Sequence, residues 1–245
     1  MTTIRMFHVS DLHFGREDVA ALDWFANTVH AEKPDALIVT GDYTFRARSA
    51  EFAAAAEYLE ALDTPMTLEP GNHDLPYYNP FKRFFTPYRR YLNVEKKVEH
   101  RLDLPGVAVV PLRTTSRFQW RWNQSKGVVR PKALSTTLAE LAAVPDGRMK
   151  IIACHHPLAD VEDFAKPQRT RGGGAALAAL AKAGAVAVLS GHVHDPFDRP
   201  WTGVSPAIRL IGAGTLSARV RRTPPSFNEL RVENGTLSVI RRDMG

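Results

Sequence analysis

Apolar and polar positions follow two alternating patterns over the first 70 residues of the chain. Residues 4–10 and 36–40 are short, nearly continuous apolar runs, which are typical of strands buried on both faces of a sheet. Residues 17–33 and 49–62 carry apolar side chains at helical spacing. A third, shorter strand is predicted at 66–68. The order strand, helix, strand, helix, strand predicts βαβ units and a largely parallel sheet.

The second half of the chain continues this alternation and then becomes all-β. Residues 131–143 predict a helix that begins with proline, which is well tolerated in a first helical turn. Buried strands are predicted at 150–154 and 185–189, with an Ala- and Leu-rich helix at 175–182 between them. Three strands are predicted at 207–212, 227–232 and 236–241, and Asn234-Gly235 indicates a two-residue hairpin turn between the last two.

The region between these halves is less regular. Residues 77–92 predict a small amphipathic helix whose aromatic rings pack inward while its Arg and Lys side chains stay in water. The alternative is a surface that stacks nucleotides and contacts phosphates. The apolar runs 98–104 and 107–112, separated by Pro105-Gly106, predict a β-hairpin. Residues 116–130, which include Trp120 and Trp122, lack periodicity and predict a loop near the functional site.

The composition is that of an ordinary globular protein. The 245 residues, 44% hydrophobic and 24% charged, suffice for a full hydrophobic core. Because no linker or internal repeat divides the sequence, residues 1–245 are expected to form one domain. There is no apolar run of the roughly 20 residues needed for a membrane span. With no signal peptide evident and a single cysteine, Cys154, we expect a cytoplasmic protein.

The net charge of +6 is concentrated in one segment. Residues 79–130 contain 12 Lys or Arg and three Asp or Glu, so the rest of the chain is slightly acidic. A basic segment raises the local concentration of anionic ligands. A merely solvated basic face would have the same composition, so both interpretations stay open.

Polar residues with metal-ligand chemistry follow five of the predicted strands. In chain order the groups are Asp11-x-His13, Gly41-Asp42, Gly71-Asn72-His73-Asp74, His155-His156 and Gly191-His192-x-His194. Each group alone could simply cap a turn. Ligands of parallel sheets bind beyond the carboxyl ends of the strands, so the five groups are expected to converge. Gly71 is expected to form a tight turn that directs Asn72 toward the site.

The types and number of these donors predict a pair of metal ions. Imidazole together with carboxylate suits Zn, Fe and Mn, whereas Ca and Mg prefer oxygen ligands. The donors outnumber the four to six positions around one ion, and two ions sharing a bridging carboxylate fit better. Paired ions about 3.5–4 Å apart are typical of phosphoryl hydrolysis.

These residues, in this order and with these glycines, resemble the calcineurin-like metallophosphoesterase superfamily. The resemblance extends from Asp11 to His194 and includes all five blocks of that family. Within the superfamily the chain is most similar to the class III cyclic nucleotide phosphodiesterase group. The protein Ser/Thr phosphatases fit less well, because Thr44-Phe45 stands where their motif has Val-Asp. Lipid-A-type pyrophosphohydrolases usually carry Arg at the position of His73.

The resemblance implies a fold and a set of metal ligands. The fold is α/β, with a two-sheet β-sandwich flanked by helices in an αββα arrangement. Asp11, His13 and His194 would hold the first metal, Asn72, His155 and His192 the second, and Asp42 would bridge both. The two ions would be Mn, Fe or Zn. His156, beside the ligand His155, is expected to shape the site.

The resemblance also assigns the proton chemistry. A metal-bridging hydroxide would attack phosphorus in line, and His73 would protonate the leaving oxygen as the general acid. Asp74 would be the carboxylate that orients His73. Related phosphodiesterases often form dimers, so a homodimer is a further expectation.

The sequence thus predicts a dinuclear metal-dependent phosphodiesterase that hydrolyses small anionic phosphodiesters. Cyclic nucleotides such as cyclic AMP are the first expected substrates, followed by glycerophosphodiesters. One alternative is a nuclease acting on nucleic acid, motivated by the basic and aromatic segment 79–130. Another is a metal-stabilised binding module, although such a module would not need the proton donor His73.

Overall fold

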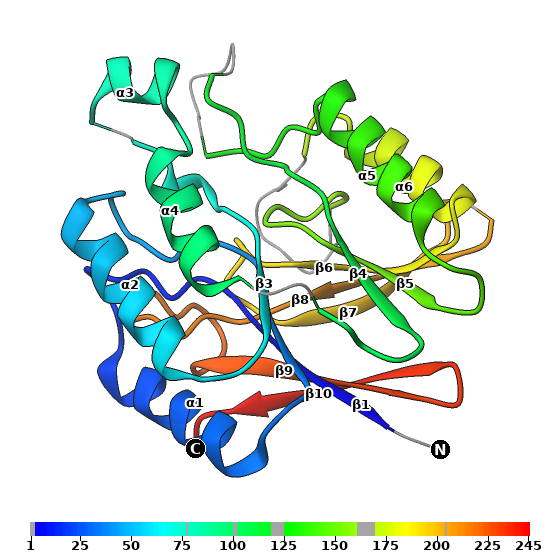
Figure 1. Ribbon diagram of the computed structural model, residues 1–245, viewed down its shortest axis with the longest axis horizontal. Helices are drawn as coiled ribbons and strands as arrows, with labels where there is room; N and C mark the ends of the chain where they lie inside the picture. Colours follow the sequence, from blue (N-terminus) through cyan, green and yellow to red (C-terminus); the bar gives the residue numbers. More distant parts are fainter. Residues whose placement is uncertain (1–2, 77, 100–101, 119–124, 161–169, 204) are drawn as a thin grey trace.

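The computed structural model of the chain describes residues 3–76, 78–99, 102–118, 125–160, 170–203 and 205–245. Within these residues, two mixed sheets of five strands stack on one another and helices flank the outer faces (Figure 1). This arrangement confirms the predicted αββα fold. None of the helices formed by the described residues has the length and apolar character needed to cross a bilayer.

The first sheet contains the three parallel strands predicted near the N-terminus. Its strand order is β10 (Thr236–Asp243), β9 (Ser226–Glu233), β1 (Ile4–Val9), β2 (Ala36–Val39) and β3 (Met66–Leu68). β1 is parallel to β2, and β2 to β3, whereas β9 is antiparallel to both β1 and β10. The carboxyl ends of β1, β2 and β3 therefore lie at one edge of this sheet.

The second sheet places the carboxyl ends of its central strands at an edge in the same way. Its order is β4 (Val107–Pro111), β5 (Met149–Ala153), β6 (Ala185–Ser190), β8 (Ile208–Gly212) and β7 (Phe197–Trp201). The first four are mutually parallel, and β7 pairs antiparallel with β8 at the edge. The sequence pattern did not predict β7, whose residues are only partly buried or exposed.

Helices cover the outer face of each sheet. The described helices are α1 (Val19–Glu32), α2 (Ser49–Ala61), α3 (Pro80–Phe85), α4 (Arg89–Val98), α5 (Pro131–Ala143) and α6 (Gly173–Lys182), and α3 alone among them has no buried residue. α1, α2 and α4 pack on the first sheet, and α5 and α6 on the second. Capping residues define both ends of α1. The Asp18 side chain accepts a hydrogen bond from Ala21 N at its start, and Lys33 ends the helix in the left-handed conformation.

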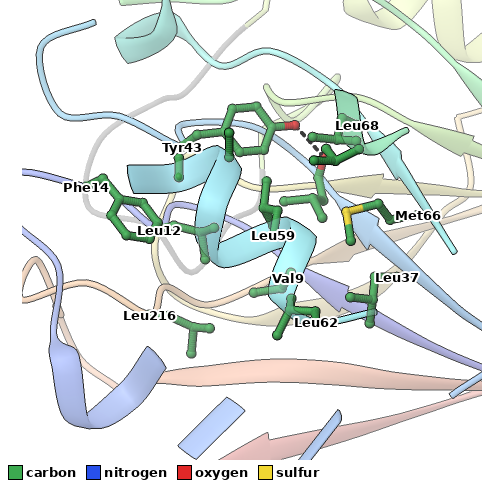
Figure 2. Close-up of a cluster of buried hydrophobic side chains, with 14 of the residues drawn as sticks. Val9, Leu12, Phe14, Leu37, Tyr43, Leu59, Leu62, Met66, Leu68 and Leu216 are labelled. Carbon is green, nitrogen blue, oxygen red and sulfur yellow. Dashed lines mark hydrogen bonds between the residues drawn. The ribbon is translucent and has the colours of Figure 1, made fainter. Parts of the chain in front are cut away.

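Strand residues alternate between two cores because successive side chains of a strand point to opposite faces. On β1, Phe7 packs under the helices, and Met6 joins the apolar layer between the sheets. Figure 2 shows the helix-side core of the first sheet, where Leu59 from α2 lies near Tyr43. The Tyr43 hydroxyl reaches the carbonyl oxygens of Val39 and Glu69 at 3.1 and 2.7 Å, which joins the ends of β2 and β3.

The structure corrects the prediction of a hairpin over residues 98–112. Val98 is the last residue of α4, and no strand forms among the described residues 98, 99 and 102–104. β4 instead pairs in parallel with β5, with Val107 opposite Met149. The apolar positions Tyr91, Val94 and Val98 lie on the buried face of α4 and therefore belong to a helical repeat.

The structure also corrects the amphipathic helix predicted at 77–92. The described part of this stretch forms two helices, α3 and α4, interrupted at Thr86-Pro87. Tyr91 packs inward as predicted, but Phe81, Phe84 and Phe85 are 71%, 51% and 62% exposed. Residues 77, 100–101 and 119–124, which include Trp120 and Trp122, lie outside the described residues.

Candidate active site

The five groups of polar residues predicted at strand ends meet at one place. Asp11 and Asp42 follow β1 and β2, Asn72 follows β3, and His155 and His192 follow β5 and β6. The site thus receives residues from both sheets. Asp11, His13, Asp42, His155 and His194 are each 3% exposed or less, while Asn72, His73 and His192 are partly exposed. The partly exposed residues lie where a substrate could approach.

The backbone at these strand ends is unusual. Positive φ angles occur at five of the seven predicted ligands, namely Asp11 (58°), His13 (48°), Asp42 (55°), His192 (71°) and His194 (64°). Left-handed backbone is uncommon for residues other than glycine, and clusters of it mark functional sites. In each of the two pairs of alternate residues, Asp11 with His13 and His192 with His194, both members adopt it. This geometry shows how alternate residues leaving a strand turn toward one point.

Four donor atoms form the first cluster. Asp11 Oδ1 lies 3.1 Å from His194 Nε2 and 3.5 Å from His13 Nε2, and the two Nε2 atoms are 3.2 Å apart. Asp42 Oδ2 lies 3.8 Å from His13 Nε2. Donors bound at about 2.0–2.2 Å to one cation are separated by about 3–3.5 Å, close to the spacing of this cluster.

A second cluster shares the carboxylate of Asp42. Its Oδ2 atom lies 3.4 Å from His155 Nε2, which is 3.2 Å from Asn72 Oδ1. The His192 ring lies beside that of His155, with ring centroids 5.2 Å apart. Asp42 Oδ1 accepts a hydrogen bond from His73 N, so Oδ2 remains directed at both clusters.

Backbone carbonyls fix the orientation of four histidines. The Nδ1 atoms of His13, His73, His155 and His194 donate to the carbonyl oxygens of Thr44, Phe45, Thr40 and Arg219, respectively. A carbonyl can only accept, so Nδ1 carries a proton and Nε2 is the nitrogen that faces the site. Such outer partners fix the tautomer of metal-binding histidines.

His156 has a different role from His155. Its Nε2 atom donates to Ser125 O at 2.8 Å, and its Nδ1 atom lies 2.9 Å from Thr114 Oγ1. Because both of its ring nitrogens have hydrogen-bond partners, His156 contributes packing and not a metal-binding atom. Its ring lies beside that of His192, with the two centroids 4.6 Å apart. Thr114 and Ser125 belong to the basic segment 79–130, which therefore contributes to this side of the site.

The buried charges fit a pair of cations. Asp11 Oδ1 is fully buried and accepts no hydrogen bond from any described residue, so a cation would satisfy it. Burial opposes ionisation of Asp42, but the neighbouring His155 and His73 outweigh burial and hold the pKa of Asp42 well below its usual range. Burial also lowers the pKa of His155, but Asp42 outweighs it and raises that pKa to about 9. A cation would displace such a proton, because metal ligands bind in the deprotonated form.

His73 stands at the edge of the first cluster. Its ring packs edge-on against that of His13, with centroids 4.8 Å apart, and stacks on Phe45 at 5.6 Å. Because Nδ1 is bound to Phe45 O at 2.7 Å, only Nε2 faces the site. The ring therefore presents one nitrogen for proton exchange with a ligand.

The structure corrects the role expected for Asp74. Its Oδ1 atom accepts from Thr44 N and Thr44 Oγ1 at 2.9 and 3.0 Å, and its Oδ2 atom accepts from Gly71 N at 2.8 Å. The carbonyl of Phe45, and not this carboxylate, orients His73. Asp74 instead joins the loops that follow β2 and β3.

The expectation for Gly71 also needs correction. Its φ of −92° and ψ of 177° are extended, so no tight turn requires glycine there. A Cβ atom at this position would lie 2.0 Å from Asp42 Oδ1 and 2.3 Å from Asp42 N. Gly71 is therefore needed for the close approach of two loops that carry Asp42 and Asn72.

Arg219 is a site residue that sequence reasoning missed. Its Nη1 atom donates to His13 Nε2 and His73 Nε2 at 3.1 and 3.2 Å, while its carbonyl holds His194. It lies between β8 and β9, 25 residues beyond the last ligand motif. The basic run Arg219-Val220-Arg221-Arg222 was the only signal in the sequence.

Two known proteins resemble this chain in sequence. The 3′,5′-cyclic adenosine monophosphate phosphodiesterase CpdA of Escherichia coli K12 is 26% identical over 215 residues, covering 82% of this chain and 73% of that protein. The glycerophosphodiester phosphodiesterase GpdQ of Enterobacter lignolyticus is 35% identical over 78 residues, covering 27% of this chain and 28% of that protein.

Solved structures show the same fold at low identity. A dimetal phosphatase from Danio rerio has a TM-score of 0.69 at 13% identity, covering 98% of this chain and 96% of that one. Purple acid phosphatase PPD1 from yellow lupin has a TM-score of 0.66 at 13% identity, covering 99% of this chain and 52% of that one. The model of the calcineurin-like phosphoesterases matches residues 4–196. The chain belongs to the calcineurin-like phosphoesterase family and is a hydrolytic phosphoesterase.

Proposed function

We propose that this protein hydrolyses small phosphodiesters with two metal ions bound at the joined ends of its sheets. The observation that carries the proposal is the position of Asp42 Oδ2, which lies 3.8 Å from His13 Nε2 and 3.4 Å from His155 Nε2. One carboxylate oxygen between two sets of donors suits a pair of ions that share a ligand.

Seven residues would hold the two ions. The first set is Asp11, His13 and His194, the second is Asn72, His155 and His192, and Asp42 belongs to both. The donor set of imidazole, carboxylate and one amide favours Mn, Fe or Zn. When bound, two such cations stabilise negative charge on phosphoryl oxygens and lower the pKa of a coordinated water.

His73 would act as the general acid. Hydrolysis of a diester adds the oxygen of water to phosphorus and releases an alkoxide, which needs a proton. His73 Nε2 faces the site beside His13, and Phe45 fixes the ring by accepting from Nδ1. Protonated on Nε2, His73 would donate that proton to the leaving oxygen.

The first substrates to compare are a cyclic nucleotide, such as cyclic AMP, and a glycerophosphodiester. Support comes from the resemblance of the motifs to class III cyclic nucleotide phosphodiesterases. Similarity to the cyclic AMP phosphodiesterase CpdA and to the glycerophosphodiester phosphodiesterase GpdQ agrees with both choices. A nuclease stays the second candidate, because His156 is held by residues of the basic segment 79–130.

The proposal is tested by removing and returning the metal. We expect chelator-treated protein to be inactive on bis(p-nitrophenyl) phosphate and to recover when Mn, Fe or Zn is added. Asp42→Ala should lose metal from both sites and abolish turnover, because Asp42 faces both clusters. Asn72→Ala should reduce turnover by weakening the second site alone. Metal content by elemental analysis and the rate of nitrophenolate release are measured together.

Three further comparisons complete this experiment. His73→Asn should keep both ions and lose turnover, which separates proton transfer from metal binding. Arg148→Ala, a change in a half-exposed side chain just before β5, should retain the wild-type rate. Unchanged turnover in Asp42→Ala would refute the shared-ligand site. A nuclease would show oligonucleotide affinity that falls steeply with salt.

A further inference from the structure

Three arginines surround one aromatic ring at the edge of the site. The guanidinium carbons of Arg16, Arg46 and Arg219 lie 5.6, 5.2 and 5.5 Å from the centroid of the Phe45 ring. They come from three separate loops, after β1, after β2 and between β8 and β9. Phe45 itself stacks on His73. The fold thus gathers three positive charges beside the proposed general acid.

No side-chain ion pair with a carboxylate neutralises these three arginines in the described part of the chain. Among the described residues, Arg16, Arg46 and Arg219 form no ion pair, whereas Arg5, Arg209 and Arg242 all pair with Asp or Glu. The carboxylate of Glu51 on α2 accepts from the backbone amides of Arg46 and Arg48 and pairs with the side chain of Arg48. Contact with an aromatic face offsets little of the mutual repulsion of three cations. An anion would relieve it.

The position of the cluster indicates which part of a substrate would supply that anion. The rings of His73, His13 and Phe45 pack against one another, with centroids 4.8 Å apart for His73 and His13, 5.6 Å for His73 and Phe45, and 6.2 Å for His13 and Phe45. A proton donor must lie on the side where the leaving oxygen departs. The arginines are therefore on the leaving-group side of the scissile phosphate.

Arg219 links this cluster to the metal site. Its Nη1 atom donates to the lone pairs of His13 Nε2 and His73 Nε2. A cation bound by His13 would take the lone pair that this guanidinium contacts, so Nη1 would lose that acceptor and could turn toward an anion. Arg is suited to that task, since its planar fork binds phosphate through two parallel hydrogen bonds.

We propose that Arg16, Arg46 and Arg219 bind a second phosphate group, carried by the leaving portion of the substrate. The inference rests on the proposed function and adds to its substrates small phosphodiesters whose leaving group carries a second phosphate, which cyclic AMP lacks. The segment 79–130 is not the source of these charges, although its own excess of basic residues is larger than the chain's net charge of +6.

The test uses binding, so that it does not depend on turnover. Thymidine 3′,5′-bisphosphate is compared with thymidine 3′-monophosphate and thymidine 5′-monophosphate by titration calorimetry on the manganese-loaded protein. One phosphate of each probe occupies the metal site, and only the bisphosphate offers a second. We expect the bisphosphate to bind about tenfold more tightly or better, the effect of one charge-assisted phosphate contact.

Matched variants then locate the second phosphate. Arg16→Ala/Arg46→Ala and Arg219→Ala should each bring the ratio of affinities close to one. Arg48→Ala removes a charge from the same loop as Arg46 without touching Phe45, and should keep the wild-type ratio. Because the ratio is measured within one preparation, partial loss of metal or folding affects both probes alike. If Arg219→Ala does not fold, the variant Arg16→Ala/Arg46→Ala, which changes two exposed side chains, still tests the proposal.

Each result has one interpretation. Equal affinities in the wild-type protein would overturn the proposal, as would a ratio that survives in the double variant. If Arg219→Ala weakens all probes equally, Arg219 binds the scissile phosphate and not a second one. Failure of the proposed function shows itself separately, as absence of hydrolysis of bis(p-nitrophenyl) phosphate whatever the ratio is.

Discussion

Glycines at this site are required by the groups that they contact. A Cβ at Gly191 would lie 1.8 Å from Ser10 Oγ, and one at Gly41 would lie 2.5 Å from Gly71 N. A Cβ at Gly71 would lie 2.0 Å from Asp42 Oδ1. Each of these glycines precedes a predicted metal ligand, so the absence of a side chain lets neighbouring strand ends approach one another. The ligands can then converge within a few ångströms.

Gly71→Ala is expected to damage the metal site while leaving the sheets intact. The added Cβ would meet Asp42 Oδ1 at 2.0 Å, and the carboxylate would have to move. We expect metal affinity to fall by about 10–100-fold, as when a group that supports a ligand is lost. Competition with a coloured chelator measures this affinity.

Gly174→Ala is the matched control for this substitution. Gly174 lies in α6, and a Cβ there would meet no atom within 4 Å. The change should leave metal affinity as it is and stabilise the protein by up to about 1 kcal/mol, the helix preference of Ala over Gly. Equal metal affinity in Gly71→Ala and wild type would show that the contact with Asp42 is unimportant.

The sequence identified the polar residues that follow the strands, but not the residues that hydrogen-bond to them. The convergence of Asp11, Asp42 and His155 could be predicted, because each follows a strand of a largely parallel sheet. The role of Asp74 could not, because its partners Thr44 and Gly71 are set by the packing of two loops. Arg219 could not be placed either, since it comes from a loop far along the chain.

At the scale of elements, one ion cluster joins three strands and a helix. Glu229 on β9, only 1% exposed at its side chain, accepts hydrogen bonds from Arg5 on β1, Arg231 on β9 and Arg242 on β10. Glu32 at the end of α1 pairs with two of these arginines. Burial alone would raise the pKa of Glu229, but hydrogen bonds from the arginines outweigh it and lower that pKa to about 2.

Glu229→Gln should therefore destabilise the protein at pH 7 and less so in acid. Because the folded pKa lies below the unfolded value of 4.5, the unfolded state binds more protons between pH 4.5 and 2. The ionised carboxylate contributes its full stabilisation above pH 4.5, and this is lost as pH falls toward 2. The shift corresponds to roughly 3 kcal/mol, an upper value for the effect. Urea unfolding at pH 7 and pH 3 measures it.

Glu233→Gln provides the comparison, because Glu233 is an exposed residue of the same strand. It should change the free energy of unfolding little at either pH. A Glu229→Gln variant whose loss of stability is the same at pH 7 and pH 3 would contradict the account, since a charge effect must decline as the carboxylate is protonated.

Helices and strands were predicted where the repeat was long or the burial complete. The strand at 36–40 and the helix α2 could be assigned from the sequence because each contributes apolar residues to a large hydrophobic core. The hairpin at 98–112 failed because a short apolar run fits helix and strand equally, and the choice depends on which sheet lies nearby. The exposed Phe81, Phe84 and Phe85 contradict the rule that rings pack inward, which no local pattern could have revealed.

At the scale of the whole molecule, the site depends on both sheets. Asp11, Asp42 and Asn72 come from the first sheet, while His155, His192 and His194 come from the second. The apolar layer between the sheets, which includes Ile151 and Leu230, fixes their distance from one another. Convergence at this edge could be predicted from parallel strands within one sheet. The meeting of two sheets was implied only by the family resemblance.

Bound metal should consequently stabilise the whole fold. Ligands from two sheets bind the same ions only when the sheets are stacked, so the folded state alone offers the site. A free metal concentration about 100 times the Kd adds about 2.7 kcal/mol to the free energy of unfolding. For a chain of this size, that corresponds to a rise in Tm of about 5–10 °C. Calorimetry of the chelated and manganese-loaded protein measures the difference.

Two variants show whether this stabilisation acts through the shared ligand. Ile151→Ala creates a cavity between the sheets and should cost about 2–5 kcal/mol with or without metal, while the rise in Tm on loading persists. Asp42→Ala removes the carboxylate that faces both clusters, and its rise in Tm should largely disappear. A wild-type Tm that does not respond to metal would mean that the two halves of the site do not bind a common pair of ions. A rise that survives in Asp42→Ala would place the stabilising ions outside these clusters.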